Sequence, residues 1–246
     1  MSVAAVFAAG AIGCSSNNTS KPTASDYDDV AQSLSVVVTA QGSGGETGSI
    51  AASASLASGV TPANVSVNAK GTFDSASAGL DYQFSVTCTD AKGQANACGP
   101  ATDDASADVT WSGNLSLPNL TASVERSGQY TLTGVQSGTA TFNGAGSFTF
   151  DSQFVSLFRN EQVKNHLSLS SSYSNVTFDE SAKYVTGGTV HYTVDATRDA
   201  AGTSGTKDAN FAIDAVLAFQ ADGSALLTLD GTAQYKVGAS GVVVKI

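Results

Sequence analysis

Three cysteines and two histidines are the residues of this chain with the most specific chemistry. Cys88 and Cys98 are separated by nine residues, and an even pair of cysteines in an exported chain favours a disulfide. A metal site or a redox pair is the alternative, but either would need a Cys-x-x-Cys spacing with a nearby histidine, which is absent. We therefore expect a structural Cys88–Cys98 bridge, which stabilises the fold by about 2.5–3 kcal/mol in the chain-entropy model.

The two histidines, His166 and His191, fall beside or within expected strands. They would either meet across a sheet, as a zinc pair or an acid–base pair, or lie separately on a solvated surface. No third ligand is marked, and the chain has no Gly-x-Ser-x-Gly elbow, phosphate-binding loop or EF-hand loop. We therefore expect solvated histidines, no catalytic residue, no metal and no cofactor, and we predict that the protein is not an enzyme.

An uncharged, mostly apolar run from Met1 to Gly13 ends directly before Cys14. It is too short for a permanent membrane-spanning helix, which needs about 20 residues, but it fits the apolar region of an export signal. The segment Ala11-Ile12-Gly13-Cys14 resembles the lipobox of bacterial lipoproteins, in which small residues precede an invariant cysteine. The resemblance covers only these fourteen residues. It implies that Cys14 is acylated and begins the mature chain; an ordinary thiol in a tail is the alternative.

This leader divides the chain into three expected parts. Residues 1–13 are the lipoprotein signal peptide, residues 14–25 hold the lipidated Cys14 and a flexible polar tether, and residues 26–246 form a single antiparallel β domain. Ser15 stands where inner-membrane lipoproteins of enteric type often carry Asp. The analogy favours a lipid anchor in the outer membrane, on its periplasmic or surface face, so the membrane of the cell envelope is the expected partner.

Alternation of apolar and polar residues dominates the sequence from Leu80 onward. Successive side chains of a strand point to opposite faces, so each alternating segment should have one buried and one solvated face, which is typical of antiparallel sheets. The Asp-Gly pair at residues 222–223 predicts a hairpin from Phe219 to Leu229. Weaker strands are expected at Leu34–Thr39, Ile50–Leu56, Val65–Phe73, Leu120–Glu125, Tyr130–Thr133, Thr139–Phe142, Phe148–Phe154, Leu167–Tyr173 and Val242–Ile246.

Two segments are candidates for short helices. Residues 25–28 (Ser-Asp-Tyr-Asp) resemble a capping box ahead of Asp29–Leu34, where acidic residues favour a helix N-terminus. Gln153–Asn165 has helical apolar spacing, with a wide loop as the alternative. The predicted fold class is therefore all-β: a large antiparallel meander sheet curled into an open barrel, a half-barrel or a sandwich, with at most one or two short helices.

The charge balance excludes one class of partner. The formal net charge is -10, and the eleven Lys and Arg residues are scattered singly along the chain. Nucleic-acid binding needs clustered cations that neutralise phosphates, so we expect no nucleic-acid partner.

Three functions remain, and each predicts a different structure. The first is an envelope lipoprotein with a non-enzymatic structural or protein-binding β domain, which should have no buried cavity. The second is a carrier of a hydrophobic ligand, which needs a continuous apolar pocket. The third is a hydrolase of envelope polymers, which needs His, Asp or Glu side chains converging in a cleft. The residues that would line a carrier's pocket, or else form ordinary core, are Phe148, Phe150, Phe154, Phe211, Ile213 and Phe219.

The lipobox and the cysteine pair predict the intact mass of the protein after gentle extraction from its own membrane. The chain should begin at Cys14, be heavier by its acyl chains, and be lighter by two hydrogens for the Cys88–Cys98 bridge. Native mass spectrometry measures all three changes, and reduction should restore the two hydrogens. A mass equal to the unmodified chain that retains residues 1–13 would contradict both the anchor and the envelope localisation.

Overall fold

Two helices precede a long series of strands in the computed structural model, which describes residues 20–39, 45–62, 65–67, 73–77, 79–117, 119–200 and 209–246. The elements in chain order are α1 Ala24–Thr39, α2 Gly45–Ala57, β1 Val65–Val67, β2 Phe73–Ser77, β3 Leu80–Thr89, β4 Ala95–Asn96, β5 Asp104–Leu117, β6 Leu120–Thr133, the 3-10 turn η2 Val135–Ser137, β7 Thr139–Val155, β8 Gln162–Asp179, β9 Tyr184–Ala200, β10 Ala209–Phe219, β11 Ala225–Leu229, β12 Ala233–Val237 and β13 Val243–Lys245.

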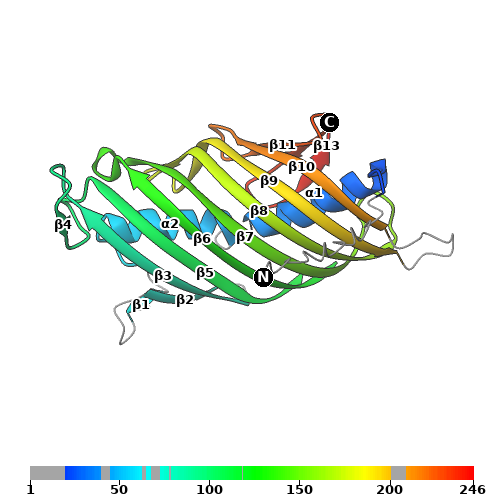
Figure 1. Ribbon diagram of the computed structural model, residues 1–246, viewed down its shortest axis with the longest axis horizontal. Helices are drawn as coiled ribbons and strands as arrows, with labels where there is room; N and C mark the ends of the chain where they lie inside the picture. The colour runs from blue at the N-terminus through cyan, green and yellow to red at the C-terminus, as the bar shows by residue number, and fades with distance from the viewer. Residues whose placement is uncertain are drawn as a thin grey trace, which may run out of the picture.

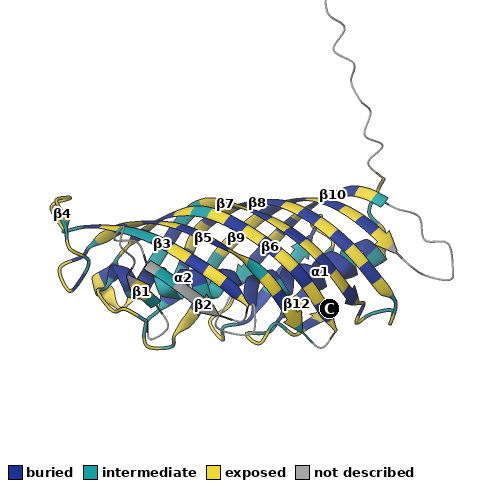
Figure 2. Cartoon of the chain, turned by 90° about the horizontal axis from the view of Figure 1, so that it is seen from below, coloured by how far each residue is buried: buried dark blue, intermediate teal, exposed yellow. Residues whose placement is uncertain are grey.

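All of these strands belong to one antiparallel sheet. Each pairs with its neighbours in sequence, in the order β1-β2-β3-β5-β6-β7-β8-β9-β10-β11-β12-β13, and β4 adds a short pairing to β3. The strands cross the molecule obliquely, and both ends of the sheet curl towards the side that holds α1 and α2 (Figure 1, Figure 2). The edge strands β1 and β13 do not pair with each other in the described structure, so the sheet stays open. The all-β meander prediction is confirmed, in its open-barrel or half-barrel form.

Burial alternates along the strands as the sequence pattern predicts. Along β8, for example, Val163, Asn165, Leu167 and Leu169 are buried, and the residues between them are exposed. The alternation forms bands of buried and exposed residues across the sheet (Figure 2). The buried face is the concave one, because that face carries the helices and the common hydrophobic core.

The hairpin between β10 and β11 is also confirmed. Phe219 pairs with Ala225, and the backbone amide of Gln220 donates to the carbonyl of Ser224 at 2.8 Å. Gly223 has a φ of 77°, in the left-handed region that a glycine adopts without steric cost. The Asp-Gly pair therefore lies at the turn.

The two helices correct the sequence prediction at three points. Leu34–Thr39 and Ile50–Leu56, expected as strands, lie in α1 and α2. Helix α1 begins at Ala24, two residues before the expected start of the β domain, and its capping residue is Thr23 instead of Ser25. The backbone amide and the hydroxyl of Thr23 each donate to Asp26 Oδ2 at 2.7 Å. Short apolar runs do not separate buried helix from strand by periodicity alone, and these two runs are covered by the sheet.

The segment Gln153–Asn165 is neither a helix nor a wide loop. Strand β7 continues to Val155, β8 begins at Gln162, and a tight connection joins them. Phe154 points into the core from β7, and the ring of Phe158 in the connection packs against Tyr235 at 6.1 Å between centroids. The helical spacing of these aromatic residues therefore reflects two separate contacts with the core.

Helix α1 is held on the sheet by three buried carboxylates near its N-terminus. Each carboxylate meets a cation or a tyrosine hydroxyl of a strand or of a strand connection. The contacts join Asp26 to Arg198, Asp29 to Arg159 (Oδ2 to Nη2, 2.6 Å), and Asp28 to Tyr235 (2.6 Å) and Lys245 (2.8 Å). Because a buried carboxylate is costly without a partner, these pairs determine where α1 lies.

Candidate functional site

The structure describes two of the three cysteines and both histidines. Cys88 and Cys98 form a disulfide that ties the end of β3 to the loop after β4, as predicted. Cys14, the expected lipidation site, lies outside the described residues. No functional cluster therefore forms around the cysteines that the structure describes.

The histidines lie on the outer face of the sheet, and each pairs with an aspartate. His166 Nδ1 lies 2.7 Å from Asp151 Oδ1, and His191 Nε2 lies 2.8 Å from Asp214 Oδ1, with both histidine side chains about half exposed. His191 pairs in register with Ser172 of β8, six residues along that strand from His166. At about 3.4 Å per residue the two rings are roughly 20 Å apart, so they do not meet as a zinc or acid–base pair. Nor do the described residues hold any group of three His, Cys, Asp or Glu side chains that would bind a metal.

A buried charged cluster lies under the N-terminus of α2. Arg126 of β6 forms a two-pronged ion pair with Glu46, through Nη2–Oε1 at 2.8 Å and Nε–Oε2 at 3.2 Å, and neither side chain is exposed. Arg126 Nη1 donates to the carbonyl of Val109 at 3.0 Å, and the hydroxyl of Tyr130 contacts both charged groups. This geometry satisfies most of the donors of the guanidinium, as a buried arginine requires.

Small residues make room for this cluster. Gly128 and Gly146 pair with each other on β6 and β7, beside the Arg126 side chain. A Cβ on Gly128 would lie 2.6 Å from the Arg126 guanidinium, and a Cβ on Gly146 would lie 2.9 Å from the Ser127 carbonyl. These two glycines therefore allow the guanidinium to lie flat against the sheet.

Burial shifts the ionisation of the cluster. It raises the pKa of Tyr130 well above its ordinary value of 10.0, and the negative charge of Glu46 raises it further. Burial likewise raises the pKa of Tyr173 and of Tyr192. For Arg126, burial alone would lower the pKa, but Glu46, Tyr130 and Tyr173 together outweigh burial and leave the pKa raised.

Perturbed ionisable groups are common at active sites, but this cluster is closed to solvent. Glu46 is 0 % exposed, and Arg126, Tyr130 and Tyr173 are 2–3 % exposed. A substrate could not reach these atoms without displacing α2. The cluster therefore positions the helix.

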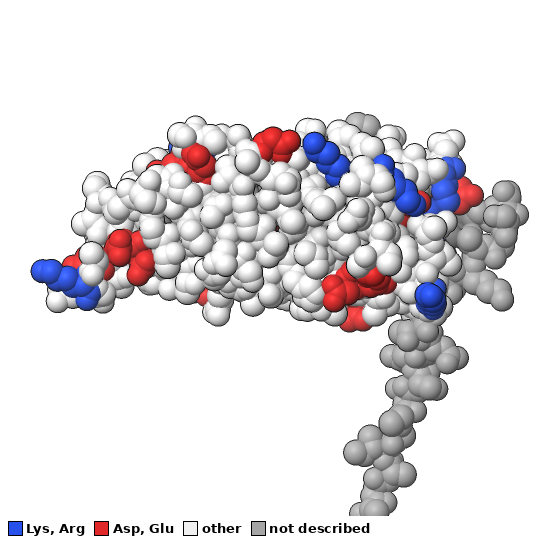
Figure 3. Space-filling view, turned by 90° about the horizontal axis from the view of Figure 1, so that it is seen from above, with Lys and Arg blue, Asp and Glu red and all other residues white. Residues whose placement is uncertain are grey.

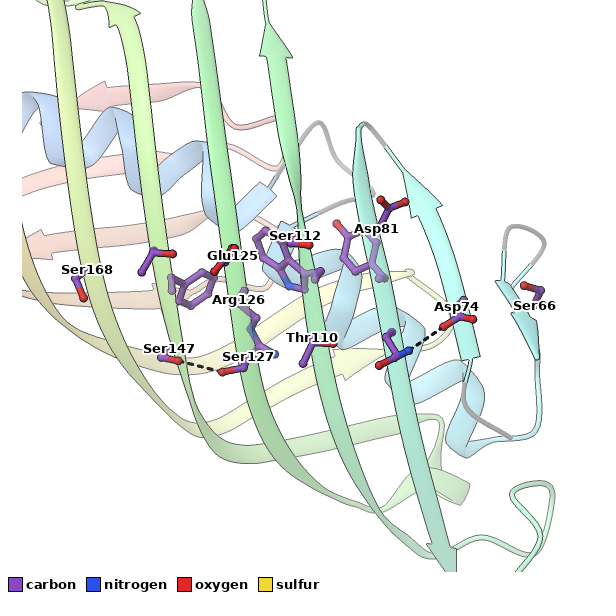
Figure 4. Close-up of a pocket in the computed structure, with 15 residues that line it drawn as sticks. Ser66, Asp74, Asp81, Thr110, Ser112, Glu125, Arg126, Ser127, Ser147 and Ser168 are labelled. Carbon is purple, nitrogen blue, oxygen red and sulfur yellow. Dashed lines mark hydrogen bonds between the residues drawn. The ribbon is translucent and has the colours of Figure 1, made fainter. Parts of the chain in front are cut away.

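A depression of about 820 Å³ lies on the outer face of the sheet and is lined mainly by polar side chains. Side chains of β1 to β3 and β5 to β8 line it, among them the solvent-facing Thr110, Ser112, Glu125, Ser127 and Ser147 (Figure 4). The hydroxyls of Ser127 and Ser147 lie 3.1 Å apart across the strands. The face of the molecule seen in Figure 3 is mostly uncharged, with acidic and basic residues in small separate groups.

This depression is wide and shallow. Its polar side chains stand side by side on neighbouring strands, and the aromatic residues beneath it, Tyr82, Trp111 and Phe148, point to the buried face. Ligand sites usually bury most of the ligand against apolar walls. The depression offers solvated hydroxyls without such walls, so we regard it as the outer surface of the sheet.

A smaller concavity is an apolar cleft of about 290 Å³ on the concave side, where the sheet fails to close. One wall comes from β3, at one end of the sheet, and includes Phe84. The opposite wall comes from β8 to β12 and includes Phe178, Val185, Phe219 and Val237. The cleft thus lies between the two ends of the open sheet, which the meander topology keeps apart.

Helix α2 supplies the floor of this cleft through a face of small residues: Thr47, Gly48, Ala51, Ala52 and Ser55. These residues recur at helical spacing, so they share one side of the helix. The opposite side of α2, with Ile50 and Leu56, is buried in the core. Large side chains on the floor would fill the cleft, and the small ones leave it open.

The polar atoms of the floor are already engaged. The hydroxyls of Thr39, Thr47 and Ser55 each donate to a backbone carbonyl of α1 or α2, at 2.8–3.1 Å. The cleft therefore presents mainly methyl groups and aromatic rings to a ligand. Its chemistry suits an apolar molecule.

The cleft only partly matches the residues that the sequence suggested. Of the six candidates, Phe219 alone lines it, and the other five are ordinary core, at most 2 % exposed: Phe148, Phe150, Phe154, Phe211 and Ile213. Sequence reasoning missed the floor because it assigned Ile50–Leu56 to a strand. A helical reading of residues 45–57 would have revealed the row of small residues.

Comparison with known proteins adds no functional assignment. No protein-family model, curated protein sequence or solved structure matches the chain. Within the described residues, neither helix combines the length and apolar character required to cross a membrane.

Replacing Arg126 with Met should strongly destabilise the fold. The change leaves Glu46 buried without its cation, which costs about 3–5 kcal/mol. Adding Glu46→Met should recover most of this loss, because two apolar side chains can replace a buried pair. Urea unfolding monitored by circular dichroism measures both effects, with Lys236→Met, at an exposed ion pair, as a control of small effect. Equal stability of Arg126→Met and the parent chain would show that the pair does not hold α2.

The buried tyrosines should make the fold unstable at strongly alkaline pH. In the folded protein the pKa values of these tyrosines lie above the unfolded value near 10. Their contribution to the free energy of unfolding is therefore fully present below about pH 10, and it is lost as the pH rises through the folded pKa values. Phenolate absorbance of Tyr130, Tyr173 and Tyr192 should therefore appear only as the sheet unfolds. Parallel titrations by ultraviolet absorbance and circular dichroism test this. Ionisation of all seven tyrosines with an unchanged dichroism spectrum would contradict it.

Proposed function

We propose that this chain is a lipid-anchored protein of the cell envelope whose β domain carries a small apolar ligand in the cleft above α2. The observation that supports this proposal is the cleft itself: apolar walls from both ends of the sheet over a floor of small residues. A continuous apolar pocket was the feature expected of a carrier. A structural or protein-binding domain was expected to have no buried cavity.

The size and chemistry of the cleft suit a slender ligand. Ligand pockets commonly measure about 300–1,000 Å³, and 290 Å³ lies just below that range. Transfer of apolar surface from water is favourable by about 25 cal/mol per Å², so a single alkyl chain gains affinity without polar contacts. The same volume argues against a ligand with several chains.

The position of the cleft is consistent with an anchor at Cys14. The chain enters the described domain at Ser20, whose backbone amide donates to the carbonyl of Asn210 near the start of β10. Phe219, at the other end of β10, lines the cleft, nine residues or roughly 30 Å away. An acylated Cys14 in the outer membrane would therefore leave the cleft away from the attachment point, where a ligand can be exchanged.

We propose a carrier without catalysis. The lining that the structure describes for this cleft contains no Asp, Glu, His or Cys side chain. General acid–base and nucleophilic chemistry both need such groups within reach of the substrate. A hydrolase of envelope polymers is therefore poorly supported by this site.

Filling the cleft should abolish ligand binding. We expect the full-length protein to bind dodecanol in a one-to-one complex, and Ala52→Phe to bind it at least about tenfold more weakly, because the new ring occupies the floor. Val60→Phe is the matched control, since it adds a similar ring at a position that is 60 % exposed and outside the cleft. Native mass spectrometry and displacement of a fluorescent alkyl probe report the binding. The carrier function is rejected if the parent chain does not bind dodecanol, or if Ala52→Phe binds it equally well.

A further inference from the structure

We infer that the ligand of the cleft is a single-chain amphiphile with one anionic head group, which Lys183 binds at the mouth. This inference rests on the proposed carrier function and adds the chemical class of the ligand. The shared head-group chemistry is a carboxylate or a phosphate monoester on one alkyl chain.

The charge of the cleft lining is the first argument. Lys183 is the single charged residue among the described lining residues, and none of them is acidic. This is unusual in a chain whose formal net charge is -10. Among the described residues, Lys183 makes no ion pair, whereas Arg126, Arg159, Arg198 and Lys245 all do. Its ammonium group is therefore available to a ligand.

The mouth of the cleft is formed by two adjoining turns. Lys183 ends the turn between β8 and β9, with a φ of 63°, and Tyr184 follows it. The Tyr184 hydroxyl donates to the carbonyl of Ala221 in the turn between β10 and β11, at 3.4 Å. A Cβ on Gly223 would lie 3.0 Å from the Tyr184 ring, so ring and glycine are in close contact. This packing holds Lys183 beside the opening.

Three acidic residues belong to these two turns: Asp179 and Glu180 precede Lys183, and Asp222 lies between β10 and β11. Asp179 accepts hydrogen bonds from the backbone amides of Ser181 and Ala182. Asp222 accepts from Ser224 and lies 3.6 Å from Lys236. These contacts engage two of the three carboxylates, and Lys183 is the charged group that lines the cleft itself.

The combination of an apolar interior and one cation at the rim defines the ligand. A neutral alkane would make no electrostatic contact with Lys183, and a cationic amphiphile would be repelled by its ammonium group. A chain with an anionic head can bury its tail between Phe84 and Phe219 while its head stays in water beside the ammonium group. The 290 Å³ volume restricts it to one chain.

Binding of four probes of equal chain length to the full-length protein tests the inference: dodecanoate, dodecyl phosphate, dodecanol and dodecylammonium. At least one anion should bind about fivefold more tightly than dodecanol, the upper range for an exposed ion pair, and dodecylammonium should bind most weakly. The preference should shrink as salt is added. The tighter of the two anions identifies the head group.

Two lysine variants complete the experiment. Lys183→Gln should abolish the preference for anions over dodecanol, whereas Lys183→Arg should retain it. Lys164→Gln is the matched control, because it removes the same charge near the opposite end of β8. Equal binding of anions and dodecanol, or a preference that survives in Lys183→Gln, would overturn this inference and leave the carrier function standing. If no probe binds, the carrier function itself fails.

Discussion

The buried pairing of helix carboxylates with sheet cations is the constraint on which the structure depends. All three arginines of the chain take part: Arg126 with Glu46, Arg159 with Asp29, and Arg198 with Asp26. The helices are rich in small and polar residues, so apolar burial alone gives them little preference for one orientation. A buried carboxylate is tolerated only where its cation lies, and this requirement places each helix on the sheet.

The same constraint leads from the fold to the proposed site. The Glu46–Arg126 pair holds the N-terminus of α2 against β6, over the space left by Gly128 and Gly146. With that end held, one side of α2 packs into the core, and its small residues lie beneath the gap between the two ends of the sheet. The open meander and the orientation of the helix are thus both needed for the cleft. A closed barrel would have no gap, and a rotated helix would fill it.

Several parts of the fold were predictable because they depend on local chemistry. Strict alternation from Leu80 onward predicts half-buried antiparallel strands, and the Asp-Gly pair at residues 222–223 predicts the best hairpin. The cysteine pair predicts the disulfide that the structure contains. The two helices were harder to predict from the sequence. Leu34–Thr39 and Ile50–Leu56 are buried on nearly all sides, which removes the amphipathic period that distinguishes a helix from a strand.

The sequence by itself therefore determined the all-β class, the strand order of a meander, the Cys88–Cys98 bridge and the resemblance of the leader to a lipobox. Each follows from residues that are adjacent or close in the chain. Only the tertiary structure decided which acids meet which arginines, and that the cleft is lined by Phe84, Phe178 and the small face of α2. Those partners are separated by tens of residues, and their meeting depends on the curl of the whole sheet. A pattern read along the chain contains no measure of that curl.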